Sequence, residues 1–311
     1  MSHVIVVGSG PLGRATTRDL VSQGHDVTVA TRSGTSLPDA RSTRVDVVTG
    51  EGLGELPRAE AIVACCNFAY SAKSWLSCWP PAIDHLIRAT EQRDATLVVA
   101  GNLYAYSRRM PMRATDPLEP PTALGEARAV ASQRLFAAHD AGRIRGVEVR
   151  GSDYYGPDSG SMSHLSRRFF EPLLAGRPAW ILGDPDAIHT WTAVADFGRL
   201  LARAATDPTM AGRAWHVPSA PAVSRREVAT HFLRLAGIDH APRLRPLPPA
   251  LLTAMSWFSP MMRALRSLLP QLTEPYVMED QDTRDLLAET HTPMETTLRA
   301  VIEELGENSP R

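Results

Sequence analysis

The chain has 311 residues, enough for one large or two medium domains with a sizeable core. Its hydrophobic content of 43%, its charged content of 22% and its formal net charge of -1 are those of an ordinary globular protein. Such a charge gives no overall field that attracts nucleic acid or an anionic membrane, so we expect neither as a partner. The three cysteines provide neither a disulfide framework nor a paired metal-binding pattern, and the chain enters its first strand without a signal sequence. We therefore expect a cytoplasmic protein.

The first 33 residues have the pattern of a dinucleotide-binding strand, turn, helix and strand. Residues 4–7 are an apolar run and residues 27–29 a second β-branched run, and a G-x-G-x-x-G turn follows the first of them. Its first glycine allows a tight turn, its second lets the backbone approach a pyrophosphate, and its third lets the helix pack close to the strand. A glycine-rich turn of another α/β protein is the alternative. The predicted contacts to the dinucleotide are Gly8, Ser9, Gly10, Pro11, Leu12 and Gly13.

Strand and helix patterns alternate through the first half of the chain, which predicts a doubly wound parallel sheet of the Rossmann type. The further predicted strands are 44–48, 61–66, 96–100 and 146–150, and the further predicted helices are 75–91 and 125–140. Pro80 and Pro81 indicate that the first of these helices is kinked or begins at Pro80. The proline-rich segment 107–122 is predicted to be a loop.

The second half is less regular, with a predicted helix at 169–174, a short strand at 179–182 and a helix within 191–205. The most apolar tract, 246–270, is either the core of a small domain or the wall or lid of an apolar pocket. We predict an NADP-binding domain over 1–150 with a return near 186–222. A smaller, discontinuous C-terminal domain over 151–185 and 223–311 is predicted to bind the substrate.

A series of short segments resembles the extended short-chain dehydrogenase/reductase family over nearly the whole chain. In order they are the GSGPLG turn, Asp46-Val47, the LYAY stretch after the fifth strand, a helix start at Leu124, RGSDYYGP, and HTWTAVADF around Asp196. No single segment is specific, but their order is. The resemblance implies a nicotinamide dinucleotide cofactor and supports the fold prediction.

The chain departs from that family at the residues that usually transfer protons. Family members with the usual chemistry carry Tyr-x-x-x-Lys at the start of the helix and a serine or threonine after the fifth strand. Here these positions hold Leu124, Arg128 and either Ala100 or Gly101. Leucine cannot exchange a proton and arginine stays charged, although it can hold a ribose hydroxyl or a carboxylate. The chain is therefore similar to the atypical branch of the family.

Arg32 and Ser33 follow the second strand, where an NAD-preferring enzyme has an acidic residue. A guanidinium and a hydroxyl there suit the 2′-phosphate of NADP(H), and a solvated loop arginine is the alternative. The resemblance implies that Asp46 and Val47 flank the adenine. It also implies further cofactor contacts from Cys65, Cys66, Asn67, Ala100, Arg128 and Ser152. Asn67 can equally be a turn former.

The catalytic residues stay unknown, with Tyr104, Tyr154 and Asn102 as candidates. A tyrosine hydroxyl can give up a proton, whereas an amide can only donate a hydrogen bond. Packing in a pocket wall is the alternative for the tyrosines, and a surface or capping role is the alternative for Asp153. The predicted substrate contacts are Tyr104, Ser152, Asp153, Tyr154 and Met255. No histidine spacing indicates a metal site.

We expect an NADPH-dependent ketoreductase, because hydride delivery depends chiefly on positioning. Within the atypical branch the chain is similar to ketoreductases of angucyclinone antibiotic biosynthesis. That similarity implies a bulky aromatic polyketide ketone as the substrate, and the internal hydrogen bond of a ketone beside a phenol eases the need for a protein acid. The alternatives are a nucleotide-sugar epimerase or dehydratase, which needs a base to oxidise an alcohol, and a dinucleotide-binding regulator without turnover.

Overall fold

The computed structural model describes residues 2–307, which divide into two compact units. Unit 1 comprises the chain up to residue 108 together with residues 114–151 and 197–217. Unit 2 comprises residues 109–113, residues 152–196 and the chain from residue 218 onward. Each unit contains its own strands and its own buried side chains.

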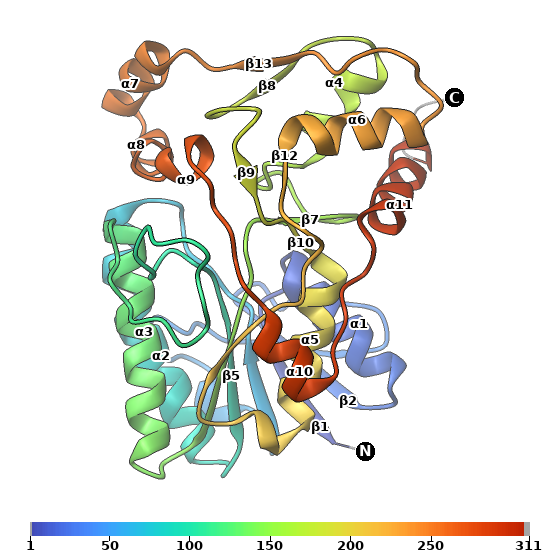
Figure 1. The fold of residues 1–311 in the computed structure, drawn as a ribbon. Coiled ribbons are helices and arrows are strands. Elements are labelled where there is room, and N and C mark those ends of the chain that lie inside the picture. Colours follow the sequence, from blue (N-terminus) through green and yellow to red (C-terminus); the bar gives the residue numbers. More distant parts are fainter. Residues whose placement is uncertain (1, 308–311) are drawn as a thin grey trace. The chain divides into compact units, whose positions relative to one another are not determined.

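Unit 1 is built on a seven-stranded parallel sheet with the strand order β11-β6-β5-β4-β1-β2-β3 (Figure 1). The strands are β1 His3–Val7, β2 Asp26–Thr31, β3 Arg41–Arg44, β4 Ala61–Ala64, β5 Thr96–Gly101, β6 Arg145–Arg150 and β11 Ala214–His216. The direction in which strands are added reverses between β1 and β4, and ligands of such sheets bind at the carboxyl ends of the strands at this point. The predicted doubly wound α/β fold is confirmed.

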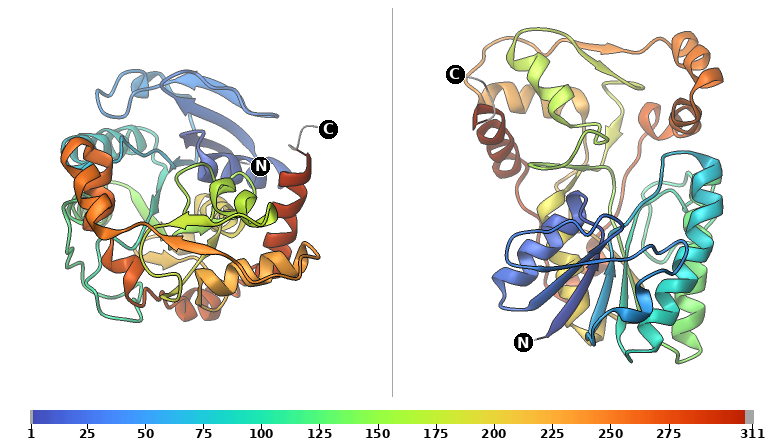
Figure 2. Two further views of the ribbon diagram at one scale, coloured as in Figure 1. Left: turned by 90° about the horizontal axis from the view of Figure 1, so that it is seen from above. Right: turned by 180° about the vertical axis from the view of Figure 1, so that it is seen from behind.

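Helices cover both faces of this sheet. They are α1 Pro11–Ser22, α2 Ala72–Glu91, α3 Ala123–Asp140 and α5 Val194–Thr206, with 3-10 helices at Leu53–Glu55 and Pro208–Met210. Helices α2 and α3 lie side by side on one face (Figure 2). On the other face α5 approaches α1 so closely that a Cβ at Gly198 would lie 2.5 Å from the Cβ of Ala15. Because both faces are covered, the central strands β1 and β4 are apolar and almost entirely buried.

The third strand lies earlier in the sequence than predicted. β3 ends at Arg44, whereas the predicted strand covers residues 44–48, so that prediction is wrong. The reason is Asp46, whose carboxylate accepts a hydrogen bond from the Val48 amide at 2.8 Å. An aspartate that binds a backbone amide two residues later makes a turn, and this local bond outweighs the β-propensity of the neighbouring valines.

Helix α2 also differs from its prediction. It begins at Ala72, where the Ser71 side chain accepts a hydrogen bond from the Ser74 amide at 3.2 Å, and it continues through Pro80 and Pro81. Of the two predicted alternatives, a start at Pro80 is therefore wrong, and the kink stays a prediction. The side chain of Arg134 on α3 donates to the Pro80 carbonyl at 3.0 Å, which joins the two helices beside the proline pair. The helix thus continues through two prolines that locally disfavour it.

Unit 2 has three pairs of short strands and most of the remaining helices. The pairs are β7 Tyr154–Tyr155 with β10 Thr192–Ala193, β9 Ile188–His189 with β12 Val223–Ser224, and β8 Ala179–Ile181 with β13 Leu244–Pro246. The helices are α4 Arg167–Leu174, α6 Arg225–Leu235, α7 Pro249–Phe258, α8 Pro260–Ser267, α9 Pro270–Thr273, α10 Gln281–Leu287 and α11 Met294–Glu307. Phe170 of α4 and Phe232 of α6 lie at the centre of its core, with ring centroids 4.4 Å apart.

The apolar tract 246–270 forms β13 in part, then α7 and α8, and it is only partly a core. Leu252 is 2% exposed, but Trp257 is 69% exposed and Phe258 is 87% exposed. The prediction of a domain core is therefore wrong for these two aromatic residues. Among residues 2–307, no helix combines the length and the apolar character that a membrane crossing requires.

Candidate cofactor and catalytic site

The turn between β1 and α1 is shaped by its three glycines. Gly8 has φ +109°, and a Cβ there would lie 3.0 Å from the backbone of Cys65 after β4. A Cβ on Gly13 would lie 2.0 Å from the Gly8 carbonyl oxygen. At Gly10, which directly precedes α1, a Cβ would meet no atom within 4 Å. The turn is thus tightly closed on its inner side and open where the helix begins, which fits a bound pyrophosphate.

The other residues of this turn stabilise its shape. Pro11 is the first residue of α1, where a missing amide hydrogen costs nothing. The Ser9 carbonyl accepts a hydrogen bond from the Arg14 side chain at 3.0 Å, and the Leu12 carbonyl accepts one from the Thr16 hydroxyl at 2.8 Å. The predicted phosphate-binding residues therefore form one continuous turn at the carboxyl end of β1.

Arg32 and Ser33 directly follow β2, and both are exposed. The Ser33 hydroxyl lies 2.7 Å from the Thr35 hydroxyl. No acidic residue stands at this position, so the end of β2 presents a cation and hydroxyls to a ligand. This arrangement suits a phosphate group.

Asp46 and Val47 lie in the turn after β3, beyond the strand itself. One carboxylate oxygen of Asp46 accepts amide hydrogen bonds from Val48 at 2.8 Å and from Thr49 at 3.3 Å. Val47 is 7% exposed, and its carbonyl lies 2.9 Å from a ring nitrogen of His85 on α2. The turn is therefore fixed by the Asp46 side chain and by His85 of α2.

The segment after β4 brings Cys65, Cys66 and Asn67 beside the glycine turn. Burial raises the pKa of the Cys65 thiol to about 12. Burial also raises the pKa of Cys66 to about 11, although the charge of Arg128 opposes this rise. Both thiols are therefore protonated near neutral pH, which argues against a nucleophilic cysteine. Asn67 is exposed and accepts the Phe68 amide at 2.9 Å, as a turn former does.

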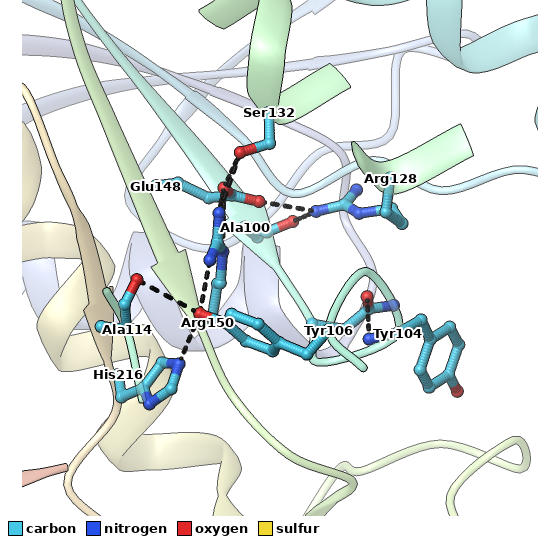
Figure 3. A network of polar contacts seen from close by, with 10 residues as sticks. Ala100, Tyr104, Tyr106, Ala114, Arg128, Ser132, Glu148, Arg150 and His216 are labelled. Carbon is cyan, nitrogen blue, oxygen red and sulfur yellow. Dashed lines mark hydrogen bonds and ion pairs between the residues drawn. The ribbon is translucent and has the colours of Figure 1, made fainter. Parts of the chain in front are cut away.

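The start of α3 holds Leu124 and Arg128, the two residues that the sequence resemblance aligns with the family's proton-transfer pair. Leu124 is 1% exposed and Arg128 is 4% exposed. Arg128 donates to the Ala100 carbonyl at 2.6 Å, and its guanidinium carbon lies 4.1 Å from the centroid of the Trp79 ring. The arginine is therefore held by protein groups at the carboxyl end of β5 (Figure 3).

A buried polar network continues from Arg128 across the sheet (Figure 3). Glu148 on β6 lies 3.8 Å from Arg128, and it accepts hydrogen bonds from Ser132 at 2.7 Å and from Arg150 at 2.6 Å. Arg150 also donates to the hydroxyl of Tyr106, which lies 2.9 Å from the Nε2 atom of His216. The network thereby ties the loop after β5 to β6 and β11.

The charges of this network determine its protonation. Burial alone would raise the pKa of Glu148, but the charges of Arg150 and Arg128 outweigh it and hold that pKa below its usual range. Burial raises the pKa of Tyr106 to about 12, so its phenol is protonated and serves a structural role. Burial lowers the pKa of Arg128, whereas negative charge on Glu148, Cys66 or Tyr104 raises it.

Neither Glu148 nor Tyr106 is among the predicted site residues. A signal for Glu148 does exist in the sequence, because Glu148 and Arg150 are charged residues two apart in a strand that is otherwise buried. Residues two apart on a strand share one face, so an ion pair could have been anticipated. Tyr106 carries no comparable signal.

Two predicted catalytic candidates, Asn102 and Tyr104, belong to one turn after β5. The Asn102 side chain accepts a hydrogen bond from the Tyr104 amide at 3.2 Å. The Tyr104 hydroxyl lies 2.8 Å from the hydroxyl of Tyr70, which comes from the segment between β4 and α2. Tyr70 is not among the predicted site residues.

The remaining predicted residues lie in unit 2. The Ser152 amide donates to the Thr192 hydroxyl at 3.0 Å, and the buried Ser152 hydroxyl has no hydrogen-bond partner among residues 2–307. Tyr154 is in β7, and its carbonyl accepts a hydrogen bond from Ser163 at 2.7 Å. Met255 is on α7 and is 39% exposed.

Asp153 forms a pair with His189, whose Nε2 atom lies 3.1 Å from the carboxylate. Burial alone would raise the pKa of Asp153, but the neighbouring His189 and the charges of His164 and Arg225 hold it below its usual range. His189 stacks on Trp191 with centroids 4.2 Å apart. Within the described part of the chain, no group of histidine, cysteine and acidic side chains has a metal-binding arrangement.

Comparison with protein families gives one match, the NAD dependent epimerase/dehydratase family, over residues 4–217. The chain belongs to this family. Comparison with curated proteins gives no match. The family assignment agrees with the resemblance to extended short-chain dehydrogenases, and it supports a nicotinamide dinucleotide as the cofactor.

Solved structures share the fold at low sequence identity. MoeE5 in complex with UDP-glucuronic acid and NAD is 20% identical with a TM-score of 0.80, covering 99% of this chain and 100% of its own. UDP-glucose 4-epimerase of Thermus thermophilus with NAD is 18% identical with a TM-score of 0.79, covering 99% and 100%. dTDP-glucose 4,6-dehydratase of Bacillus anthracis with NAD is 13% identical with a TM-score of 0.78, covering 99% and 98%. These similarities do not support an angucyclinone ketoreductase or a preference for NADP.

Proposed function

We propose that this family member is an NAD(P)H-dependent carbonyl reductase that works without the family's tyrosine and lysine. The observation that carries the proposal is the start of α3, where Leu124 and Arg128 occupy the two positions. Reduction places a negative charge on the substrate oxygen, which any nearby donor can neutralise. Oxidation of an alcohol requires a base, and neither residue can act as one. The start of α3 therefore supplies no base for alcohol oxidation, and we propose the reducing direction.

The glycine turn, the end of β2 and the segment after β4 would hold the dinucleotide. Arg32 and Ser33 support NADPH over NADH, because a guanidinium pairs with the 2′-phosphate. Arg128, which donates to the Ala100 carbonyl, would border the dinucleotide site at the carboxyl end of β5. When bound, the reduced nicotinamide supplies the hydride.

For the substrate we propose a bulky aromatic ketone of the angucyclinone type, as in antibiotic biosynthesis. The sequence resemblance supports it, and so do the exposed Trp257 and Phe258 on α7, which offer apolar aromatic surface to a polycyclic ligand. We place Ser152, Asp153 and Tyr154 of unit 2 on the substrate side. The three free cysteines suit a reducing cytoplasm.

A second candidate is a nucleotide-sugar epimerase or dehydratase. The family match and the three structural neighbours favour it directly, since those neighbours are nucleotide-sugar enzymes or contain a nucleotide sugar. Leu124 and Arg128 oppose it, because both reactions begin with removal of a hydroxyl proton.

The test offers the purified protein polycyclic aromatic ketones with NADPH and, separately, UDP-glucose and dTDP-glucose with NAD⁺. Loss of NADPH absorbance with a ketone is the expected result. Nuclear magnetic resonance follows the sugars, because an epimerase consumes no net cofactor. Conversion of a sugar with no ketone reduction would replace the proposal by the second candidate. Dinucleotide binding without any turnover would indicate a regulator.

A further inference from the structure

Two phenols meet at the carboxyl edge of the sheet in unit 1. Tyr70 precedes α2 and Tyr104 follows β5, and their hydroxyl oxygens are 2.8 Å apart. Both side chains are only partly buried. This is a hydrogen bond between two groups that can each give and accept a proton. The sequence separates the two residues, and the parallel order of β4 and β5 brings them together.

The rings of both tyrosines are held by Trp75. Tyr104 stacks on it with centroids 6.1 Å apart and an interplanar angle of 22°, and Tyr70 meets it edge-on at 5.4 Å. Trp75 is 1% exposed on α2, so it is a fixed support. The backbone of Tyr104 is held in addition by the Asn102 side chain. The two hydroxyls are therefore positioned rather than free to rotate through solvent.

Arg128 provides the electrostatic complement. A negative charge on Tyr104 would raise the pKa of Arg128, and this is the smallest of the named effects on that guanidinium. Because the attraction is mutual, Arg128 also favours a negative charge on Tyr104. Arg128 cannot itself transfer the proton, but it can stabilise the charge that proton transfer leaves behind. Arg128, which stands where the family usually has lysine, thus interacts electrostatically with Tyr104. Tyr104 comes from the turn after β5 and not from α3.

Tyr106 shows by contrast why Tyr104 is the reactive phenol of this loop. Tyr106 is 2% exposed, and its hydroxyl is engaged by Arg150 and His216. Tyr104 is two residues earlier and more exposed, and its hydroxyl partner is another phenol. Tyr104 therefore differs from Tyr106 in being partly exposed and in contacting a second phenol.

We propose that Tyr104 donates the proton to the substrate carbonyl oxygen and that Tyr70 replaces that proton, so that the two phenols form a proton relay. This inference rests on the proposed reductase function. It assigns the proton donor that Leu124 and Arg128 cannot provide, and it gives Tyr70 a positioning and resupplying role.

Hydride transfer to carbon and proton transfer to oxygen together convert the carbonyl to an alcohol. The carbonyl carbon gains a new C–H bond from the hydride that a reduced nicotinamide would supply with loss of its own C–H bond and two electrons, and the electron pair of the C=O π bond moves to oxygen. The O–H bond of Tyr104 breaks, and its proton forms the alcohol O–H. The Tyr70 proton passes to the Tyr104 phenolate oxygen, and water returns a proton to Tyr70. One carbonyl, one hydride and one proton become one alcohol.

The hydrogen bond itself is tested without substrate or cofactor. Tyrosine labelled with ¹³C at Cζ reports hydrogen bonding of each phenol by nuclear magnetic resonance. We expect Tyr70→Phe to shift the Tyr104 signal and the matched control Tyr155→Phe, which removes a hydroxyl buried in unit 2, to leave it unchanged. An unchanged Tyr104 signal in Tyr70→Phe would overturn the relay, whatever the activity of the protein.

Single-turnover reduction then tests the chemistry. We expect Tyr104→Phe to slow reduction by about 10²–10⁴-fold, the usual contribution of a positioned acid, with NADPH affinity unchanged. Tyr70→Phe should slow it by about tenfold and change its solvent isotope effect, since resupply then depends on water. Tyr155→Phe should react as the wild type does. Reduction by the wild type with an equal rate in Tyr104→Phe overturns the relay alone, whereas a wild type that reduces no ketone overturns the proposed function as well.

Discussion

The turn after β1 and the first two turns of α3 belong to the same edge of the sheet in unit 1, but they differ in how far they match the family's chemistry. At the first, Gly8 and Gly13 retain a backbone shape that no other residue fits. At the second, Leu124 and Arg128 replace the side chains that would transfer a proton. Dinucleotide binding depends mainly on backbone geometry and helix position, whereas proton transfer depends on one or two functional groups. Binding can therefore persist where the usual catalytic pair has been lost.

Gly13→Ala should have the largest effect, namely the loss of dinucleotide binding by the turn after β1. The added Cβ would lie 2.0 Å from the Gly8 carbonyl oxygen, so the turn must open and we expect no measurable dinucleotide binding. Isothermal titration calorimetry measures the affinity. The control is Gly54→Ala, since a Cβ at Gly54 meets no atom within 4 Å. Ordinary affinity in Gly13→Ala would show that the dinucleotide does not use this turn.

Glu148→Gln should test how strongly the network behind α3 supports the second region. Removal of one charge leaves Arg150 buried without its partner, which should cost about 3–5 kcal/mol in the free energy of unfolding. Urea denaturation measures this loss. The exposed pair of Glu91 and Arg143 provides the control, and Glu91→Gln should change the stability little. A small loss in Glu148→Gln would mean that the network contributes little to the fold.

The same carboxylate predicts a dependence on pH. Because its pKa is held below the usual range, its contribution to stability is present above the unfolded value, about 4.3, and is lost as the pH falls through the folded value. We therefore expect the stability difference between wild type and Glu148→Gln to shrink in acid. Urea denaturation of both proteins between neutral and acidic pH measures it. A difference independent of pH would contradict an ionised Glu148.

Arg32→Ala should have the smallest effect, and it tests whether the dinucleotide site prefers NADPH to NADH. Loss of a charged hydrogen bond, about 1.5–3 kcal/mol, weakens NADPH binding by about 10-fold to 100-fold. NADH, which has no 2′-phosphate, should bind as it does to the wild type. Fluorescence titration with both dinucleotides gives the ratio. Equal losses for the two would mean that Arg32 does not recognise the phosphate.

Much of unit 1 was predictable because its signals are local. A run such as residues 4–7 and a glycine turn fix strand, turn and helix within a short stretch, and these elements agree with the structure. The third strand was less predictable, since the side-chain bond of Asp46 competes with a β-branched run. The start of α2 was also missed, because the helix begins at the Ser71 cap, before the apolar positions on which its prediction rested.

In the candidate site, too, some features could be predicted from the sequence and others could not. The absence of the usual tyrosine and lysine can be seen from Leu124 and Arg128 alone, because it is a matter of residue identity in an ordered series of segments. What Arg128 contacts could not be predicted, since Ala100 and Glu148 come from two strands that lie on either side of it in the sequence.

The parallel α/β fold and the glycine-rich turn follow from local patterns, and Leu124 and Arg128 stand where the resemblance expects the family's tyrosine and lysine. The groups around Arg128 depend instead on the strand order, which brings residues from β4, β5 and β6 to one edge. The pairing of Tyr70 with Tyr104 is the clearest case, because the two residues are 34 positions apart in the sequence while their hydroxyl oxygens are 2.8 Å apart. Sequence patterns report periodicity and residue type, whereas proton transfer depends on distances between segments that no local pattern encodes.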